Sequence, residues 1–392
     1  MSDFDEQLRK LIHKERHNFG GSSSRVIVEL VNLIFDFAVK MRASDLHIEP
    51  FEESLRIRYR IDGHLQELHQ ALPLHLAEPL TSRIKILARM DTTAAFLPLD
   101  GAIQTGNVEM RVASMPSYGA ESLTIRLLDS SLELHNLRDL GFSDTNEKIF
   151  RQMINLSAGM IILTGPMKSG KSTTLYAVLR ELNQPSRSIM TLEDPIEQHV
   201  EGISQVQVNE KTGLTFAAGL RAMLRMDCNV LMVGEARDAE TSKIAVRAAL
   251  TGHLIFTTLH ANDSCSAVFR MLEMGVEPYL LAATLNGVVA QRLVRRLCPH
   301  CKEICADGTY KAIGCEKCRG TGYSGRIALH EVLRVDKNLR SLILNSRDLD
   351  EIRDFALENG LKTLADDALE KVRAGLTTLD EIRRVLGSDF TE

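Results

Sequence analysis

The sequence predicts an α/β protein with a mainly parallel sheet in its second half. Segments there that are apolar throughout alternate with stretches of helical periodicity, a pattern typical of a parallel sheet covered on both faces. These segments read MIILTG (160–165), SIMTLED (188–194), NVLMVGE (229–235) and HLIFTTL (253–259). The chain has 392 residues, and at about 150 residues per domain this length predicts two or three domains.

The composition is that of a soluble globular protein, with 44% apolar and 25% charged residues. The 47 Lys and Arg against 52 Asp and Glu give a formal charge of -5, which argues against a protein that coats nucleic acid. The polar start MSDFDEQLRK is not a signal peptide, and no apolar run reaches the 18 or so residues that span a bilayer. We therefore expect a cytoplasmic protein that reaches a membrane only through a partner.

A smaller α/β domain is expected over residues 26–135. Residues 1–17 are compatible with a short helix, but HNFGGSSSR (17–25) is a break, so we expect residues 1–25 to be a flexible segment. Apolar residues recur at helical spacing from Val26 to Met41. Alternating apolar and polar residues then predict strands, in SDLHIEPF (44–51), LRIRYRIDGHLQEL (55–68), Glu109–Ser114 and Leu123–Leu127.

A phosphate-binding loop is predicted at GPMKSGKS (165–172), which matches G-x-x-x-x-G-K-[ST] between an apolar strand and a helical stretch. Its backbone N–H groups would cradle phosphates at a helix N-terminus, Lys171 would reach the β- and γ-phosphates, and Ser172 would hold Mg²⁺. The alternative is a chance Gly/Ser-rich turn. The predicted nucleotide-binding residues are Gly165, Pro166, Met167, Lys168, Ser169, Gly170, Lys171, Ser172 and Thr173.

Acidic residues end two of the apolar strands. Glu235 closes VLMVGE (230–235), where a Walker-B-type carboxylate belongs, and TLEDPIE (191–197) offers Glu193, Asp194 and Glu197. One carboxylate would orient or deprotonate the attacking water while another acts through Mg²⁺. The alternative is a solvated strand end or a helix cap.

Two histidines, His253 and His260, lie at either end of the strand in TGHLIFTTLH (251–260). A histidine at a strand end is often only a turn residue. Here it could instead contact the γ-phosphate or couple hydrolysis to strand movement, and the sequence leaves both readings open.

A metal module is predicted over residues 298–330. Cys298-Pro-His-Cys301 and Cys315-Glu-Lys-Cys318 are CxxC pairs separated by thirteen residues, and two such pairs supply the tetrahedral S₄ set that suits Zn²⁺. With no open coordination position the metal would be structural. Cys305 is the odd thiol and is not expected to be a ligand. The alternative is four reduced, metal-free thiols.

The remaining residues, 331–392, are expected to form a helical C-terminal subdomain. Near its end LTTLDEIRRVLG (376–387) places Thr378 three residues before Glu381, the spacing of a capping box.

These segments together resemble the ATPases of type II secretion and type IV pilus assembly. The resemblance runs from about residue 26 to the C-terminus and is carried by several independent motifs in the family's order. They are ASDLHIEP, IRYRIDG, the P-loop, the aspartate box TLEDPIE, the Walker-B-like MVGEARD, the histidine box TGHLIFTTLHAND, AQRLVRRLCPHC, GYSGRIALHEVL and the tail LKTLADDALEKVRAGLTTLDEI.

The resemblance implies a homohexameric motor on the cytoplasmic face of the inner membrane. Each subunit would join a small N-terminal PAS-like domain to a RecA-like ATPase core (136–297), and hydrolysis of ATP with Mg²⁺ would turn a polytopic platform protein that adds pilin subunits. It also implies a Zn²⁺-containing assembly branch, because retraction ATPases lack the cysteine module.

The resemblance also assigns roles to residues. It implies Glu193 as general base, Glu235 as the Walker-B carboxylate, and His253 and His260 as histidine-box residues. Two further positions, Arg111 in EMRVASMP and Arg126 in SLTIRLL, match the N-terminal-domain arginines that reach the nucleotide. A guanidinium suits charge that develops on a γ-phosphate, whereas the alternative is that both are outward residues paired with surface acids.

The sequence departs from the family pattern at several positions. The usual GPTGSGKS has Met167 and Lys168 here, Asp-Pro-Asp before the Walker-B strand is replaced by residues 227–229 (DCN), and Ala102 stands where an Arg follows Asp-Gly. Because Lys168 replaces glycine, a positive φ there would be strained; the alternative is that the extra cation adds a phosphate contact. The domain by which many relatives dock on a membrane-anchored recruiter is expected to be absent or reduced to residues 1–24.

Rival functions remain on the sequence alone. A non-catalytic scaffold of the same machine would bind ATP and hold the ring together without turnover. A nucleic-acid translocase on the same core would show hydrolysis stimulated by DNA, and the acidic balance disfavours it, so no nucleic-acid partner is expected. The sequence does not specify type II secretion, a type IV pilus or a DNA-uptake pilus.

Overall fold

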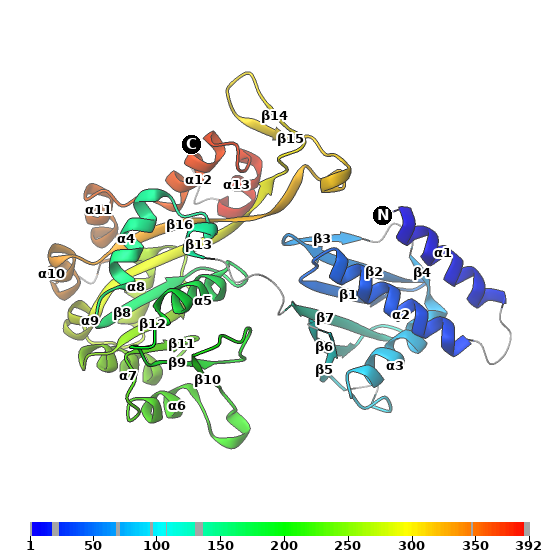
Figure 1. The fold of residues 1–392 in the computed structure, drawn as a ribbon, viewed down its shortest axis with the longest axis horizontal. Coiled ribbons are helices and arrows are strands. Elements are labelled where there is room, and N and C mark those ends of the chain that lie inside the picture. The colour runs from blue at the N-terminus through cyan, green and yellow to red at the C-terminus, as the bar shows by residue number, and fades with distance from the viewer. Residues whose placement is uncertain are drawn as a thin grey trace. The chain divides into compact units, whose positions relative to one another are not determined.

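The computed structural model describes residues 2–17, 23–67, 71–94, 97–106, 108–129, 136–345 and 348–387. The chain divides into two compact units, Met1–Leu132 and Glu133–Glu392, and each is described by itself (Figure 1).

The first unit is an antiparallel sheet with helices packed on it. The sheet order is β3-β2-β1-β7-β6-β5, with β4 beside β2. Its elements are α1 (Ser2–His17), α2 (Ser23–Lys40), β1 (Asp45–Pro50), β2 (Ser54–Ile61), β3 (His64–Glu67), β4 (Leu72–Pro73), η1 (Leu74–Leu76), α3 (Ala77–Leu87), β5 (Leu99–Thr105), β6 (Val108–Pro116) and β7 (Glu121–Asp129). The expected strands near residues 45, 55, 109 and 123 are present, and β2 buries every second residue.

The helix α1 corrects the expectation of a flexible segment across residues 1–25. Phe4, Leu8 and Ile12 recur every four residues and are buried in the core of this unit, because that spacing puts them on one face of a helix. The ring of Phe4 stacks on Phe37 of α2 with centroids 3.9 Å apart. Residues 18–22 of the expected break lie outside the described residues, and α2 begins at Ser23.

The second unit is built on one mixed sheet of order β10-β9-β11-β12-β8-β13-β16. All neighbours in this order are parallel except β13 and β16, which are antiparallel. Its strands are β8 (Gly159–Thr164), β9 (Ile189–Glu193), β10 (Ser204–Gln207), β11 (Val230–Val233), β12 (Leu254–Leu259), β13 (Leu285–Leu297) and β16 (Tyr323–Arg334), and a separate hairpin pairs β14 (Lys302–Ile304) with β15 (Tyr310–Ala312).

Helices cover both faces of this sheet (Figure 1). In β8, Met160 and Ile162 pack into one apolar cluster while Ile161 and Leu163 pack into the other, so the expectation of a parallel sheet buried on both sides is confirmed. The helices are η2 (Leu137–Leu140), α4 (Asp144–Ile154), α5 (Lys171–Leu182), η3 (Glu210–Thr212), α6 (Phe216–Met223), α7 (Ala239–Leu250), α8 (Ser264–Glu273), α9 (Pro278–Thr284), η4 (Glu316–Cys318), α10 (Lys337–Asn345), α11 (Leu349–Glu358), α12 (Leu364–Arg373) and α13 (Leu379–Leu386).

The helical C-terminal region packs on the strands β13 and β16. Apolar residues of α12 and α13 bury Ala290, Val294 and Leu329 of these strands. The predicted capping box is only half right. The Thr378 side chain caps α13 by accepting from the Glu381 N–H, but the Glu381 carboxylate binds Arg295 of β13 at 2.8 Å instead of reaching back to the cap.

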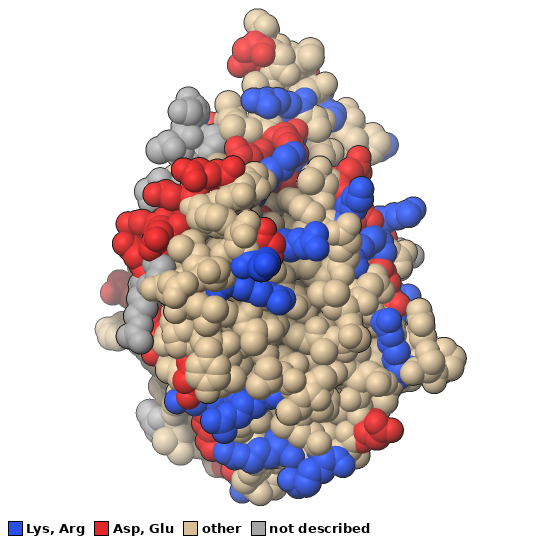
Figure 2. Space-filling view, turned by 90° about the vertical axis from the view of Figure 1, so that its left-hand side faces the viewer, with Lys and Arg blue, Asp and Glu red and all other residues tan. Residues whose placement is uncertain are grey.

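Surface charge of both signs is visible on the face drawn in Figure 2. Blue and red side chains surround a broad tan area there, and the basic residues do not form a continuous field on this face. Every helix among the described residues falls short of the length and apolar character that a membrane span requires.

Candidate nucleotide and metal sites

The predicted phosphate loop links β8 to α5, as its motif requires. Gly165 has φ +148° and Gly170 has φ +90°, conformations that favour glycine because a Cβ would be strained there. Helix α5 begins at Lys171, so its N-terminal N–H groups and the positive end of its dipole lie at the loop.

The Lys171 side chain folds back over the loop. Its Nζ donates to the carbonyl oxygens of Gly165 at 2.7 Å and Pro166 at 3.0 Å. Burial is the largest cause that lowers the pKa of Lys171, to about 8; the charge of Glu235 opposes this and that of Arg292 adds to it. The ammonium is thus held at the loop, where a phosphate would replace the two carbonyls as its partner.

The affinity for Mg-ATP is expected to fall as the pH rises through about 8, by up to roughly tenfold per pH unit. Above that pH free Lys171 loses its proton, whereas a phosphate-bound ammonium keeps it, so binding takes up a proton. Calorimetric titration at pH 7 and 9 in buffers of different ionisation enthalpy measures the uptake. The same uptake in Lys171→Arg, which stays charged at both pH values, would contradict this assignment.

Glu235 and His260 meet at the carboxyl edge of the sheet. His260 Nε2 lies 3.1 Å from Glu235 Oε1, and His260 Nδ1 lies 3.1 Å from the Gly165 carbonyl oxygen. Arg237 Nε donates to the other oxygen, Glu235 Oε2, at 2.6 Å. The imidazole therefore joins the Walker-B-type carboxylate to the first residue of the phosphate loop.

Glu193 ends β9 but its carboxylate is turned into the protein. The side chain accepts hydrogen bonds from the Tyr176 hydroxyl, from Thr191 Oγ1 at 2.5 Å and from Gln205 Nε2 at 3.0 Å, and the residue is only 4% exposed. Burial is the largest cause that raises the pKa of Tyr176, and the hydrogen bond to Glu193 is the second. The hydroxyl therefore stays protonated and donates to the carboxylate. In this conformation both oxygens of Glu193 are engaged.

The other carboxylates of the aspartate box lie differently. The backbone N–H of Glu197 donates at 3.2 Å to the same Tyr176 hydroxyl that binds Glu193. Asp194 Oδ2 lies 3.8 Å from Arg237 Nη1, and both side chains are substantially exposed.

His253 is not brought to this site. It precedes β12, where its Nδ1 lies 3.1 Å from the Ala248 carbonyl oxygen. Since β12 runs parallel to β8 and pairs Leu254 with Gly159, His253 lies at the amino edge of the sheet and the loop at the carboxyl edge, about 20 Å away along the strand. The structure therefore does not bring His253 to the phosphate loop of its own chain, because His253 begins the strand that His260 follows.

The residues that depart from the family pattern differ in their conformation and contacts. Lys168 has φ +63°, so the strain expected of a residue in place of glycine is present, at a cost of about 1 kcal/mol. Met167 is 74% exposed. Asn229 lies at the amino end of β11, where its side chain accepts from the Ser188 N–H at 2.8 Å, so it supports the sheet and not the loop.

Sequence reasoning missed two residues of β13 that lie behind the loop. Gln291 contacts both the loop and α5, and the Arg292 guanidinium donates to the carbonyl oxygens of Gln291 and Asn262 at 3.1 and 2.7 Å. The sequence pointed to them only through the segment AQRLVRRL, which is part of the family resemblance but in which neither residue had been assigned a role.

The arginines of the first unit lie in one cross-strand row of its sheet. The register places Arg60, Asp45, Arg126, Arg111 and Ala102 directly opposite one another on successive strands. The buried Asp45 carboxylate lies 3.3 Å from Arg60 Nε and 3.6 Å from Arg126 Nε. Arg111 and Arg126 stand directly opposite each other, and each also has an acidic partner, because Arg111 Nε donates to Glu109 Oε1 at 3.0 Å and Arg126 faces Asp45. The alternative of outward arginines paired with acids is therefore the arrangement in this unit.

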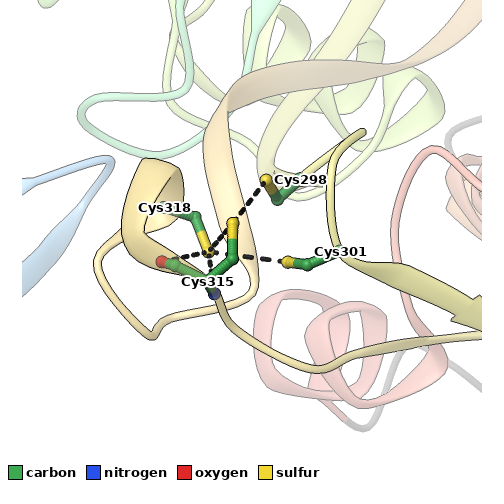
Figure 3. Close-up of side chains that lie close together, drawn as sticks. All are labelled: Cys298, Cys301, Cys315 and Cys318. Atoms are coloured by element: carbon green, nitrogen blue, oxygen red, sulfur yellow. Dashed lines mark hydrogen bonds between the residues drawn. The ribbon is translucent and has the colours of Figure 1, made fainter.

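The four predicted metal ligands come together. The Cys298, Cys301, Cys315 and Cys318 side chains point toward one another (Figure 3), and their Sγ atoms all lie within 4.8 Å of one another. Individual Sγ–Sγ distances are 3.9 Å for Cys298–Cys315, 3.6 Å for Cys301–Cys318 and 3.7 Å for Cys315–Cys318. Tetrahedral Zn²⁺ with Zn–S near 2.3 Å would set sulfurs about 3.8 Å apart, so the donor set fits zinc.

The surroundings of the cluster suit thiolates. The backbone N–H groups of Cys315 and Gly322 donate to Cys318 Sγ at 3.1 and 3.3 Å, which stabilises negative charge on the sulfur. Lys302 binds the Gly375 carbonyl oxygen at 2.7 Å, so the module is also tied to the C-terminal helices.

A mainly parallel sheet in which the inner strand β8 ends in a glycine-rich loop, with Lys171 at the start of the next helix and Glu235 joined to the loop through His260, defines a P-loop nucleotide-binding protein. Residues 21–384 match the family described as type II/IV secretion system protein. The chain belongs to this family.

Individual relatives cover most of the chain. It is 45% identical over 383 residues to the type II secretion system ATPase E of Vibrio cholerae, across 92% of this chain and 75% of that protein. It is 42% identical over 380 residues to the type IV pilus assembly ATPase PilB of Myxococcus xanthus, across 91% and 67%. The predicted resemblance to these secretion and pilus ATPases is confirmed.

Solved structures support the α/β fold. The pilus retraction motor PilT with bound ADP aligns with a TM-score of 0.64 and 26% identity, over 90% of this chain and 95% of that one. The ATPase DotB of Legionella pneumophila aligns with a TM-score of 0.69 and 23% identity, over 91% and 94%.

Proposed function

We propose that this chain is the ATP-hydrolysing subunit of a homohexameric motor that powers assembly of type IV pili or type II secretion pseudopili. It would work at the cytoplasmic face of the inner membrane through a polytopic platform protein. The observation that carries the proposal is the junction of Lys171, Glu235 and His260 at the phosphate loop in a chain 45% identical to a type II secretion ATPase. By its family the chain is an ATP hydrolase.

The loop residues take the roles expected of a P-loop. Lys171 would exchange its two carbonyl partners for the β- and γ-phosphates, and Ser172, at the start of α5, would bind the Mg²⁺ of Mg-ATP. Mg²⁺ supplies charge neutralisation on the phosphates. Glu235, held by Arg237 and His260, would act on the magnesium shell as the Walker-B carboxylate.

Glu193 is proposed as the general base, with a condition that its contacts impose. Its carboxylate must leave the hydrogen bonds with Tyr176, Thr191 and Gln205 before it can approach a water molecule. Glu197 is the second candidate, because it belongs to the same aspartate box and its backbone N–H donates at 3.2 Å to the Tyr176 hydroxyl that also binds Glu193.

Arg111 and Arg126 are proposed to bind nucleotide phosphate. Support comes from their direct cross-strand opposition, which presents two guanidinium groups side by side to an anion; a phosphate would compete there with their present partners Glu109 and Asp45. Ala102, opposite Arg111, stands where the family pattern has an arginine, so the anion site has less positive charge than that pattern provides.

The four cysteines are proposed to hold one structural Zn²⁺. The sulfur distances and the N–H donors to Cys318 support this role. A closed S₄ set leaves no position for water or substrate.

Steady-state phosphate release with Mg-ATP, measured on monomer and hexamer fractions, tests this function. Glu193→Gln and Glu197→Gln are compared side by side. We expect turnover in the hexamer, a loss of at least about a hundredfold in Glu193→Gln, which lacks the proposed general base, and little change in Glu197→Gln.

The outcomes separate the motor from its rivals. An ATP-dependent rise in Tm without phosphate release, even with membranes that contain the platform protein, would contradict the motor and favour an ATP-binding scaffold. Stimulation by DNA instead of by those membranes would favour a nucleic-acid translocase.

A further inference from the structure

The strand β13 passes directly behind the phosphate loop and presents Gln291 to it. This side chain is buried, with the residue only 2% exposed. Its Nε2 donates to the Ser169 carbonyl oxygen at 2.9 Å, and its Oε1 accepts from Thr174 Oγ1 at 2.8 Å. A single amide therefore joins the loop to the first turn of α5.

The close contact with Gln291 also requires glycine at two positions of the loop. A Cβ on Gly165 would come within 2.4 Å of the Gln291 carbonyl oxygen, and one on Gly170 within 2.7 Å of Gln291 Nε2. Heavy atoms cannot approach so closely, so a side chain at either position would push the loop away from β13. The loop is thus packed against Gln291 from both of its ends.

The orientation of one peptide group follows from these bonds. In a trans peptide the C=O and the next N–H point in opposite directions. Because the Ser169 carbonyl points at Gln291, the Gly170 N–H is turned away from β13. Backbone N–H groups of such a loop are what bind phosphate, and Gln291 fixes the direction of this one.

We propose that Gln291 is a positioning residue for nucleotide binding: its amide holds the Ser169–Gly170 peptide and the start of α5 in the arrangement that receives phosphates. The inference rests on the proposed ATP-binding function and adds to it a residue that does not itself touch the nucleotide. The competing explanation is a buried amide that only satisfies its hydrogen bonds and stabilises the fold.

The same strand offers a matched control. Asn286 of β13 is also buried, and its Nδ2 donates to the Ala158 carbonyl oxygen at 2.9 Å. That contact precedes β8, whereas Gln291 acts after it, at the opposite edge of the sheet. Gln291→Glu and Asn286→Asp make the same chemical change. In each, the side-chain NH₂ that donates to a backbone carbonyl oxygen is replaced by a carboxylate oxygen.

The experiment measures Kd for Mg-ADP, KM and kcat for Mg-ATP, and Tm for the full chain. Gln291→Glu is expected to raise Kd and KM about tenfold, equivalent to about 1.4 kcal/mol, with kcat changed less than about threefold. Gln291→Leu, which adds no charge, should give a similar loss. Thr174→Val, which keeps the donor to Ser169, should raise Kd only about threefold. Asn286→Asp should lower Tm and leave Kd unchanged.

Two results would overturn the inference in distinguishable ways. If the wild type binds Mg-ADP and both Gln291 variants keep its Kd while losing Tm as Asn286→Asp does, Gln291 is structural only. If the wild type binds no Mg-ADP, the proposed function fails and takes this inference with it. Should Gln291→Leu fail to fold, Gln291→Glu and Thr174→Val still decide the question.

Discussion

Lys171→Ala is expected to lower phosphate release from Mg-ATP by at least about a thousandfold and to remove the ATP-dependent rise in Tm. The ammonium lies at the loop, 2.7 Å from the Gly165 carbonyl oxygen, and its burial means that few water molecules screen its charge. Removing it would leave the phosphates without their nearest cation. Thermal unfolding with and without Mg-ATP, together with phosphate release, measures both effects.

A surface lysine of the same unit serves as the control. Lys148 is exposed on α4, and Lys148→Ala should keep hydrolysis within about twofold of the wild type. Unchanged ATP affinity in Lys171→Ala would rule out residues 165–172 as the phosphate site.

Loss of zinc is expected to unfold the segment 298–322 while nucleotide binding persists. Within the segment the strands β14 and β15 have three residues each, too few for an independently stable hairpin, so the metal would supply most of its folding free energy. Cys298→Ser should reduce bound zinc from about one ion per chain to nearly none. Metal analysis and hydrogen exchange over residues 298–322 measure the two changes.

Cys305→Ser is the matched control for the zinc experiment. Cys305 lies in the same segment but outside the group of four sulfurs, so its replacement should leave zinc content and exchange unchanged. Protein that contains no zinc after mild preparation would contradict the zinc assignment. Loss of Mg-ADP binding in Cys298→Ser would instead show that the module supports the nucleotide site.

The phosphate loop and the central strands were predictable because their information is local. A strand that is apolar on both faces, a glycine-rich loop and a helix start lie within residues 159–182, and each requires the others. The four cysteines were predictable for a similar reason, because two CxxC pairs at this spacing are typical of residues that bind one metal ion together.

Residues whose role depends on distant partners were not predictable. Strand β13 carries Arg292 and Arg295, which interrupt its apolar pattern. The cost of placing Arg295 there is offset by Glu381 of α13 at 2.8 Å and by the Tyr323 ring 3.9 Å from the guanidinium carbon. Gln291 likewise bonds residues more than a hundred positions earlier.

His253 shows a different limit. The resemblance assigned it and His260 to one motif, but the six residues of β12 separate them by about 20 Å. Only the direction of β12 relative to β8 decides which of the two histidines reaches the loop. The helix α1 was underestimated because the Gly- and Ser-rich stretch after it masked the four-residue spacing of Phe4, Leu8 and Ile12.

The antiparallel pair β13 and β16 has a consequence for how this chain can change. Leu297 is opposite Tyr323, and the Cys298 N–H donates to the Gly322 carbonyl oxygen at 2.9 Å, so the chain leaves the sheet and returns to it at adjacent points. The cysteine segment is therefore an excursion from a hairpin whose register is already fixed on either side. The cysteine segment can therefore be replaced without loss of the sheet. A tight turn could close the hairpin in its place, or a foreign domain could be inserted there, and the strand that bears Gln291 would remain.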